Sequence, residues 1–371
     1  MPRKILLALG VLSLAAVAGI SRPNAAPRPA PENTWSFAVS GDSRNCGDVV
    51  MPGIAASALQ QNPSFYWHLG DFRAIYKFDE DYLHEPENRS QLPAISSYLG
   101  SAWEDFIKYQ IEPFGTLPVF LGIGNHELID PRTREDYIQQ FGYWLSTPVL
   151  HQQRILDNPN DHRLMTYYHW VEKGVDFFSM DNGSLEQFSP QQLAWFEKVL
   201  NRDNHDPAIT TIVVGMHRAL PDSISRDHSM NESADGTESG RQVYNYLLQS
   251  RIQFHKKVYN LASHSHFYME NTFNTKYWNS HGGVLPGWIV GTAGAVRYEL
   301  PSKWDDARSA KTNVYGYLLG TVASNGEINF QFHQINESDT PEPVVGRYTQ
   351  EFVHWCFAEN SIVPKDATAG K

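Results

Sequence analysis

Short apolar runs rich in β-branched and aromatic residues recur along the chain, and each ends just before a polar cluster. The clearest runs are WSFAVS (35–40), SFYWHLG (64–70), LPVFLGIG (117–124), TTIVVG (210–215) and KKVYNLAS (256–263). Their length and composition predict buried strands.

Helical patterns lie between several of these runs. In residues 189–202, Ser189 can cap a helix, Pro190 stands in its first turn, and the apolar residues share one face; these are Leu193, Phe196, Val199 and Leu200. Alternation of strands and helices predicts an α/β architecture.

Two segments predict hairpins. TYYHWVEKGVDFFSMDNG (166–183) and YGYLLGTVASNGEINFQFH (315–333) each hold two apolar runs around turn residues. They add antiparallel strands, so we expect mixed sheets. The tail after His333 is expected to be irregular apart from EFVHWCF (351–357) and to pack on the core. No repeat of 20 to 50 residues recurs, which excludes solenoids and propellers.

The first residues resemble a secretory signal. Arg3 and Lys4 precede an apolar run from Ile5 to Ile20, with Ala16 and Ala18 placed for cleavage. A transmembrane helix needs about 20 apolar residues, so a retained anchor is the alternative to cleavage. A Pro- and Ala-rich linker follows at 21–33. We expect an exported protein, periplasmic or secreted, divided into signal and linker (1–32), main domain (33–335) and C-terminal extension (336–371).

Charge narrows the partners. The chain has 30 Lys and Arg against 41 Asp and Glu, a formal charge of −11, which argues against binding a nucleic-acid backbone. A small-molecule substrate is expected instead, and a phosphate is allowed because a bound metal can invert the local field. Membrane contact is expected only through an N-terminal anchor. Cys46 and Cys356 either pair, as an exported protein permits, or stay as separate buried thiols.

Potential metal ligands follow five of the apolar runs. They are Asp42, then Asp71, then Asn125 with His126 and Glu127, then His217, then His264 with His266. In open α/β sheets, the carboxyl ends of the strands meet over one crevice. Carboxylate, amide and imidazole donors suit Fe, Mn or Zn. Singly, each residue is ordinary, but their coincidence at five strand ends predicts a site for one or two transition metals.

The ordered motifs GDS (41–43), GDF (70–72), GNHE (124–127), GMH (215–217) and SHSH (263–266) resemble the calcineurin-like metallophosphoesterase superfamily. SPQQLAWFEKVL (189–200), followed by a strand and a histidine, is similar to its purple acid phosphatase branch. The resemblance covers residues 35–333. It implies two mixed sheets packed as a sandwich between helices, and a dinuclear metal centre that hydrolyses phosphate monoesters or diesters.

The resemblance also implies roles for the individual residues. Asp71 looks like the carboxylate that bridges both metals, and Asn125, His217 and His264 complete the shell of one of them. Asp42 and His266 look like ligands of the other.

His126 is similar to the catalytic histidine near the leaving group. Glu127 is expected to orient His126 by accepting a ring N–H.

Two positions depart from that pattern. The superfamily usually has a histidine two residues after the first aspartate, where this chain has Arg44. The purple acid branch has a tyrosine three residues after the second aspartate, where this chain has Ala74. Arg44 has three alternatives: it contacts the phosphate, pairs with Asp42, or points away. A mononuclear enzyme that uses Arg44 in place of one metal's charge is one hypothesis.

Two other classes of function compete. GDS also resembles the opening motif of GDSL-type serine esterases, with Ser43 as nucleophile and Asn125 as oxyanion donor, but the D-x-x-H pair that this chemistry needs is absent near the C-terminus. A non-catalytic phosphate- or glycan-binding protein on the same fold is the other alternative. His126 and Glu127 argue against it, because a pure binder has little need of an acid at the leaving group.

Overall fold

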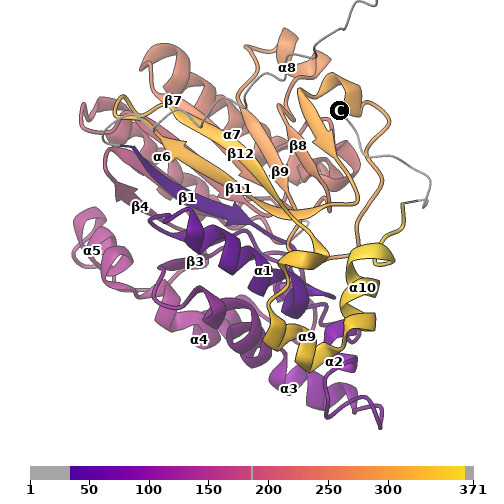
Figure 1. Ribbon diagram of the computed structural model, residues 1–371. Coiled ribbons are helices and arrows are strands. Elements are labelled where there is room, and N and C mark those ends of the chain that lie inside the picture. The colour runs from indigo at the N-terminus through magenta and orange to yellow at the C-terminus, as the bar shows by residue number, and fades with distance from the viewer. Residues whose placement is uncertain (1–33, 185–186, 364–371) are drawn as a thin grey trace, which may run out of the picture. The chain divides into compact units, whose positions relative to one another are not determined.

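The computed structural model describes residues 34–184 and 187–363 (Figure 1). The expected signal and linker, residues 1–32, lie outside the described residues. None of the helices in the described part of the chain combines the length and hydropathy that a membrane span requires.

Two mixed sheets form the body of the protein, as predicted. The first has the strand order β12-β11-β1-β2-β3 and the second β10-β8-β9-β7-β6-β5-β4. The strands are β1 (Trp35–Ser40), β2 (Tyr66–His68), β3 (Val119–Leu121), β4 (Tyr168–Glu172), β5 (Val175–Met180), β6 (Thr211–Met216), β7 (Lys257–Ala262), β8 (Tyr268–Glu270), β9 (Gly287–Val290), β10 (Ser309–Lys311), β11 (Tyr315–Val322) and β12 (Ile328–Ile335). All five predicted runs contain a strand, and β4–β5 and β11–β12 are antiparallel pairs.

Parallel pairing brings the strand ends together. In the first sheet β1, β2 and β3 run parallel, and in the second β5, β6, β7 and β9 run parallel. The residues that follow β1, β2, β3, β6 and β7 therefore emerge where parallel strands end, which is the edge where α/β proteins place their sites.

Aromatic side chains fill the space between the sheets. Phe37 of β1 packs edge-on against Phe177 of β5, with ring centroids 5.0 Å apart, and Trp67 of β2 meets Trp170 of β4 at 5.2 Å. Gly215 of β6 allows this close approach, because a Cβ there would lie 2.2 Å from the Trp67 indole. The two sheets thus share one core.

Helices cover the outer faces of both sheets (Figure 1). They are α1 (Gly47–Gln60), α2 (Glu80–Leu83), α3 (Ile95–Phe106), α4 (Arg134–Leu145), α5 (Pro148–Asp157), α6 (Pro190–His205), α7 (Ala234–Gln253), α8 (Lys276–Ser280), α9 (Glu342–Tyr348) and α10 (Gln350–Ala358). The predicted helix is α6, and the Ser189 hydroxyl caps it by accepting the Gln192 N–H at 3.2 Å. Apolar residues of α6 and α7 form a second core cluster with β5 and β6.

The tail is more regular than predicted. Residues 342–348 form α9, directly before the helix that contains EFVHWCF. Phe352 and Val353 are buried in the main core. A disulfide joins Cys356 of α10 to Cys46 at the start of α1, so the tail is tied to the loop after β1.

Candidate metal centre

Three residues at the strand ends have left-handed backbone conformations. The φ angles are 61° at Asp42, 62° at Asp71 and 66° at His264. Such angles are uncommon outside glycine and cluster at functional sites. Backbone hydrogen bonds hold two of these turns against each other, since Asp42 N–H donates to Gly70 O and Ser43 N–H donates to Asp71 O, both at 3.0 Å.

Four donor atoms converge around one point. His217 Nε2 lies 3.2 Å from Asp71 Oδ1, 3.1 Å from Asn125 Oδ1 and 3.0 Å from His264 Nδ1. Two ligands that each lie about 2.1 Å from an ion are about 3.0 Å apart when they meet at a right angle. The observed spacings therefore fit donors that share one transition-metal ion.

The electrostatics around His217 favour a cation. Burial lowers the pKa of His217, but Asp71 and Asp42 outweigh burial and raise it, so positive charge is stabilised at this imidazole. Burial lowers the pKa of His264 to about 4, although Glu232 opposes the shift. His217 Nδ1 faces Leu69 O at 3.0 Å, which leaves Nε2 for a metal. A neutral imidazole is the form that binds a metal.

Asp42 and His266 form a second pair of donors. His266 Nε2 is 3.2 Å from Asp42 Oδ1, and His266 Nδ1 donates to Val296 O at 2.6 Å. Burial would raise the pKa of Asp42, but His217 and His266 lower it to about 2. Asp71, His217 and His264 offer ligand atoms within 4.8 Å of one another, whereas no group of this kind among the described residues includes Asp42 or His266.

Arg44 points into the centre. Its Nη2 lies 3.1 Å from His266 Nε2 and its Nε 3.6 Å from Asp71 Oδ2. Only 8% of Arg44 is exposed, so the alternative that it points away is wrong. The alternative of an ion pair with Asp42 is also wrong, because Arg44 pairs with the carboxylate of Asp71 instead. Burial opposes the charge of Arg44, but Asp71 raises its pKa.

His126 lies beside this centre, with Nε2 3.7 Å from Asp71 Oδ2 and 5% of the residue exposed. Its Nδ1 donates to Ala74 O at 2.7 Å. Burial lowers the pKa of His126, although the negative charge of Asp71 opposes this shift.

The expected contact between Glu127 and the His126 ring is wrong. The Glu127 carboxylate accepts the backbone N–H groups of Asp71 and Phe72, both at 2.8 Å, and of Gly124 at 2.7 Å. Burial and Asp71 raise the pKa of Glu127 to about 7 against these three donors. Glu127 therefore supports the backbone of Asp71, and a carbonyl group orients His126.

Sequence reasoning missed several groups around His264 and His266. Glu232 Oε1 lies 3.5 Å from His264 Nε2, and Glu232 Oε2 lies 3.3 Å from Arg218 Nε. The Tyr298 ring stacks on His266 with centroids 3.9 Å apart. Glu232 ends a short 3₁₀ helix and Tyr298 lies in a loop, both away from the ends of the apolar runs, so the pattern that revealed the other donors gave no signal for them.

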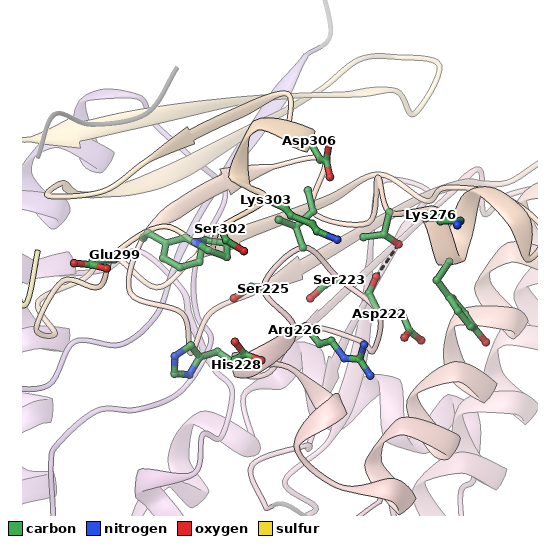
Figure 2. Close-up of a pocket in the computed structure, with 16 residues that line it drawn as sticks. Asp222, Ser223, Ser225, Arg226, His228, Lys276, Glu299, Ser302, Lys303 and Asp306 are labelled. Carbon is green, nitrogen blue, oxygen red and sulfur yellow. Dashed lines mark hydrogen bonds between the residues drawn. The ribbon is translucent and has the colours of Figure 1, made fainter.

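A cavity of about 520 Å³ lies next to His228, and its lining includes none of the predicted metal ligands. His228 lines it and is 5.7 Å from the His264 ring, measured between centroids. Figure 2 shows Arg226, Lys276 and Lys303 around the same cavity, together with His228. Polar and charged groups thus surround a space large enough for the organic part of a small substrate.

Ser43 is not placed as a nucleophile. The residue is fully buried, and its hydroxyl lies 3.0 Å from His68 Nε2. His68 Nδ1 accepts the Gly70 N–H at 3.1 Å, so the proton of the neutral ring is on Nε2 and points at Ser43. This histidine donates to the serine and cannot act as its base, which contradicts the serine-esterase alternative.

The donor chemistry fits a metal. Asp42 Oδ1 and Asp71 Oδ2 are buried and, among the described residues, accept no hydrogen bond. Buried carboxylate oxygens are normally paired or bound to a cation. These two oxygens lie beside His266 and Arg44. The residues that would hold an ion are those whose atoms converge at His217 Nε2, namely Asp71, Asn125 and His264 together with His217.

A solved structure shares the fold, and others resemble it more weakly. A purple acid phosphatase, PPD1, from yellow lupin (Lupinus luteus) seeds superposes with a TM-score of 0.54 at 16% identity, covering 84% of this chain and 53% of the lupin chain. This chain thus spans about half the length of the lupin enzyme. A structure of PhoD matches with a TM-score of 0.49 at 13% identity, covering 82% of this chain and 70% of that chain. A dimetal phosphatase from Danio rerio matches with a TM-score of 0.45 at 12% identity, covering 81% and 99% respectively.

The sequence comparisons assign the family. No curated protein sequence matches the chain. The calcineurin-like phosphoesterase family matches residues 50–268, which is more than half of the chain. That range includes Asp71, Asn125, His217 and His264, the residues whose donor atoms converge. Family membership implies a metal centre of the kind that these donors fit. The chain is a member of the calcineurin-like phosphoesterase family.

Proposed function

We propose that this protein hydrolyses phosphate monoesters or diesters of small molecules with a metal-activated water. The observation that carries the proposal is the convergence of Asp71, Asn125 and His264 on His217 Nε2 at 3.0–3.2 Å. When bound there, Fe, Mn or Zn would polarise the phosphoryl group and lower the pKa of a bound water.

Arg44 and His126 are the proposed partners of the substrate. The guanidinium of Arg44 presents N–H donors beside Asp71, and a planar fork of this kind suits a phosphoryl group. His126 lies beside the same carboxylate. Its Nδ1 donates a hydrogen bond to Ala74 O, and its Nε2 faces Asp71. A protonated Nε2 would donate its proton to the leaving ester oxygen.

The surrounding loops support a small-molecule substrate. The cavity beside His228 is lined by residues of the segment 222–228 and of the segment 299–306 (Figure 2). This cavity and the formal charge of −11 together favour a small soluble phosphoester as substrate over a nucleic-acid backbone. We also propose that the protein is exported, because the first 20 residues have the composition of a secretory signal.

Hydrolysis of two chromogenic esters tests the proposal. The purified protein is treated with EDTA, resupplied with Fe, Mn or Zn, and assayed on p-nitrophenyl phosphate and bis(p-nitrophenyl) phosphate. We expect no activity after EDTA and its recovery with at least one metal, and the preferred ester distinguishes a monoesterase from a diesterase. Asn125→Ala should lower kcat/KM at least tenfold, whereas Asn245→Ala, an exposed residue of α7, should leave it unchanged.

Two outcomes would overturn the proposal. Full activity in EDTA that is lost with a serine-directed phosphonate would establish a serine esterase. No turnover of either ester with any of the three metals, in a folded protein that still binds phosphate, would establish a non-catalytic binding protein.

A further inference from the structure

Arg44 lies between the ligands that the family would use for its other metal ion. Its Nη2 is 3.1 Å from His266 Nε2, and its Nε is 3.6 Å from Asp71 Oδ2. We propose that the Arg44 guanidinium replaces that ion, so that the centre binds one transition metal at Asp71, Asn125, His217 and His264. What this replacement means for catalysis rests on the proposed function, but the number of metal ions that the protein binds does not.

The hydrogen bonds of His266 support this replacement. His266 Nδ1 carries a proton, because it donates to Val296 O at 2.6 Å. In the neutral ring, Nε2 then has a single lone pair. Arg44 Nη2 donates to that lone pair, and a metal would need the same one at about 2.1 Å. The guanidinium and an ion therefore exclude each other at this nitrogen.

The donor set on this side is also incomplete. In the family pattern a histidine stands where this chain has Arg44, and its loss leaves Asp42, Asp71 and His266. Among the described residues, the three-member groups with ligand atoms within 4.8 Å of one another do not include Asp42 or His266. An arginine brings positive charge and no lone pair, so it cannot supply the missing ligand.

The loop that carries Arg44 is fixed from both sides. The Asn45 N–H donates to Asp79 Oδ1 at 2.6 Å, and Asn45 Nδ2 donates to Asn360 Oδ1 at 2.6 Å. The next residue, Cys46, forms the disulfide with Cys356. These contacts hold the backbone that follows Arg44, and the Ser43 N–H that donates to Asp71 O at 3.0 Å holds the residue before it. An arriving ion would therefore have to displace a charged side chain from an anchored loop.

Charge balance agrees with a single ion. Asp42 and Asp71 bring two negative charges, and Arg44 with one dication brings three positive charges. A second dication would increase the excess of positive charge beside a buried guanidinium, and this is unfavourable where the dielectric constant is low. Arg44 Nε, which is buried and has no hydrogen-bond partner among the described residues, is then available to a phosphoryl oxygen.

Metal counting tests the proposal without measuring activity. The full chain is stripped with chelator, titrated with Mn²⁺ and Zn²⁺ by calorimetry, and its bound metal is counted by mass spectrometry. We expect one tight equivalent in the wild type and two in Arg44→His, which restores the family's residue. Arg44→His combined with His266→Ala should return to one equivalent. With Mn²⁺, electron paramagnetic resonance should show an isolated ion in the wild type and a spin-coupled pair in Arg44→His.

Two tight equivalents in the wild type would overturn the proposal, whatever the variants do. One equivalent in a folded Arg44→His protein would overturn it as well, because the arginine would then not be what excludes the second ion. Neither result would contradict the proposed hydrolysis of phosphate esters, because both concern only the number of bound ions. Conversely, one bound equivalent without turnover would contradict the proposed function and leave the stoichiometry intact.

Discussion

The side chain of Glu127 holds the backbone of Asp71: Glu127 Oε2 accepts the Asp71 N–H at 2.8 Å. The same carboxylate accepts N–H groups from Phe72 and Gly124. Asp71 has a positive φ of 62°, a conformation that its surroundings must impose. Glu127 thus positions the metal-binding carboxylate through the main chain, although it follows His126 directly in the sequence.

Replacing Glu127 by glutamine tests this positioning role. Glutamine has one acceptor oxygen where glutamate has two, so at least one buried N–H loses its partner, at a cost of about 1–3 kcal/mol in stability. We expect Glu127→Gln to lower the melting temperature and to weaken metal binding about 10- to 100-fold, as loss of a group that orients a ligand does. Glu197→Gln, at an exposed position of α6, is the control and should change neither. Unchanged metal affinity in Glu127→Gln would contradict the role.

His126→Asn tests the proposed proton donor. The His126 side chain approaches Asp71 Oδ2 at 3.7 Å but donates no hydrogen bond to it. The backbone N–H that donates to Asp71 Oδ1 is kept in the variant, so metal content should stay as in the wild type. Loss of a general acid typically costs about 10²- to 10⁴-fold in rate. The loss should be large for an alkyl phosphate, whose leaving oxygen needs a proton, and small for p-nitrophenyl phosphate, whose phenolate leaves unprotonated. Equal losses on both esters would show that His126 has another role.

Gly124→Ala tests how closely the loop after β3 must approach Asp71. A Cβ at position 124 would lie 2.3 Å from Asp71 Oδ1 and 3.0 Å from His217 Cε1. Because overpacking of this kind costs about 1–3 kcal/mol and displaces two ligands, we expect lower stability and weaker metal binding, both measured by thermal shift with and without Zn²⁺. Gly100→Ala, in α3, is the matched control, since no atom lies within 4 Å of its new Cβ. Equal effects of the two substitutions would refute the expected crowding.

His169 gives the protein a pH-dependent stability away from the centre. Its Nδ1 pairs with Asp176 at 2.8 Å and its Nε2 with Asp157 at 2.6 Å. Burial lowers the pKa of His169, but Asp176 and Asp157 outweigh burial and raise the pKa to about 10. A folded pKa above the unfolded value of 6.5 means that the charged ring stabilises the fold fully below pH 6.5, and that this contribution is lost as the pH rises through about 10.

His169→Gln keeps the size of the side chain and removes the charge. We expect it to be less stable than the wild type by several kcal/mol at pH 6, since each pKa unit corresponds to about 1.4 kcal/mol. The difference in unfolding free energy between the two proteins should become smaller by pH 10, as measured by urea unfolding. A gap that is constant between pH 6 and pH 10 would show that the ion pairs contribute nothing.

The strand-end donors could be predicted because their signal is local. A polar residue placed directly after an apolar run, as Asp42 and Asp71 are, shows both the end of the strand and the donor within a few residues. Contacts made by segments that are distant in the sequence leave no such pattern, and Glu232 and Tyr298 were missed for that reason.

Two predictions failed for physical reasons. His126 and Glu127 are neighbours in a short 3₁₀ turn, where adjacent side chains point in different directions, so Glu127 reaches the backbone of Asp71 and not the His126 ring. The helix α9 was missed because its sequence, EPVVGRY, contains Pro343 and Gly346, which usually indicate a loop.

The position of a bound metal ion tests the central claim most directly. Crystals soaked in Mn²⁺ or Zn²⁺ would be measured at the absorption edge of the metal, and an anomalous map would locate the ion. We predict one strong peak about 2.0–2.3 Å from Asp71 Oδ1, Asn125 Oδ1, His217 Nε2 and His264 Nδ1. No peak at these four atoms, in crystals of protein that still hydrolyses phosphate esters, would contradict it.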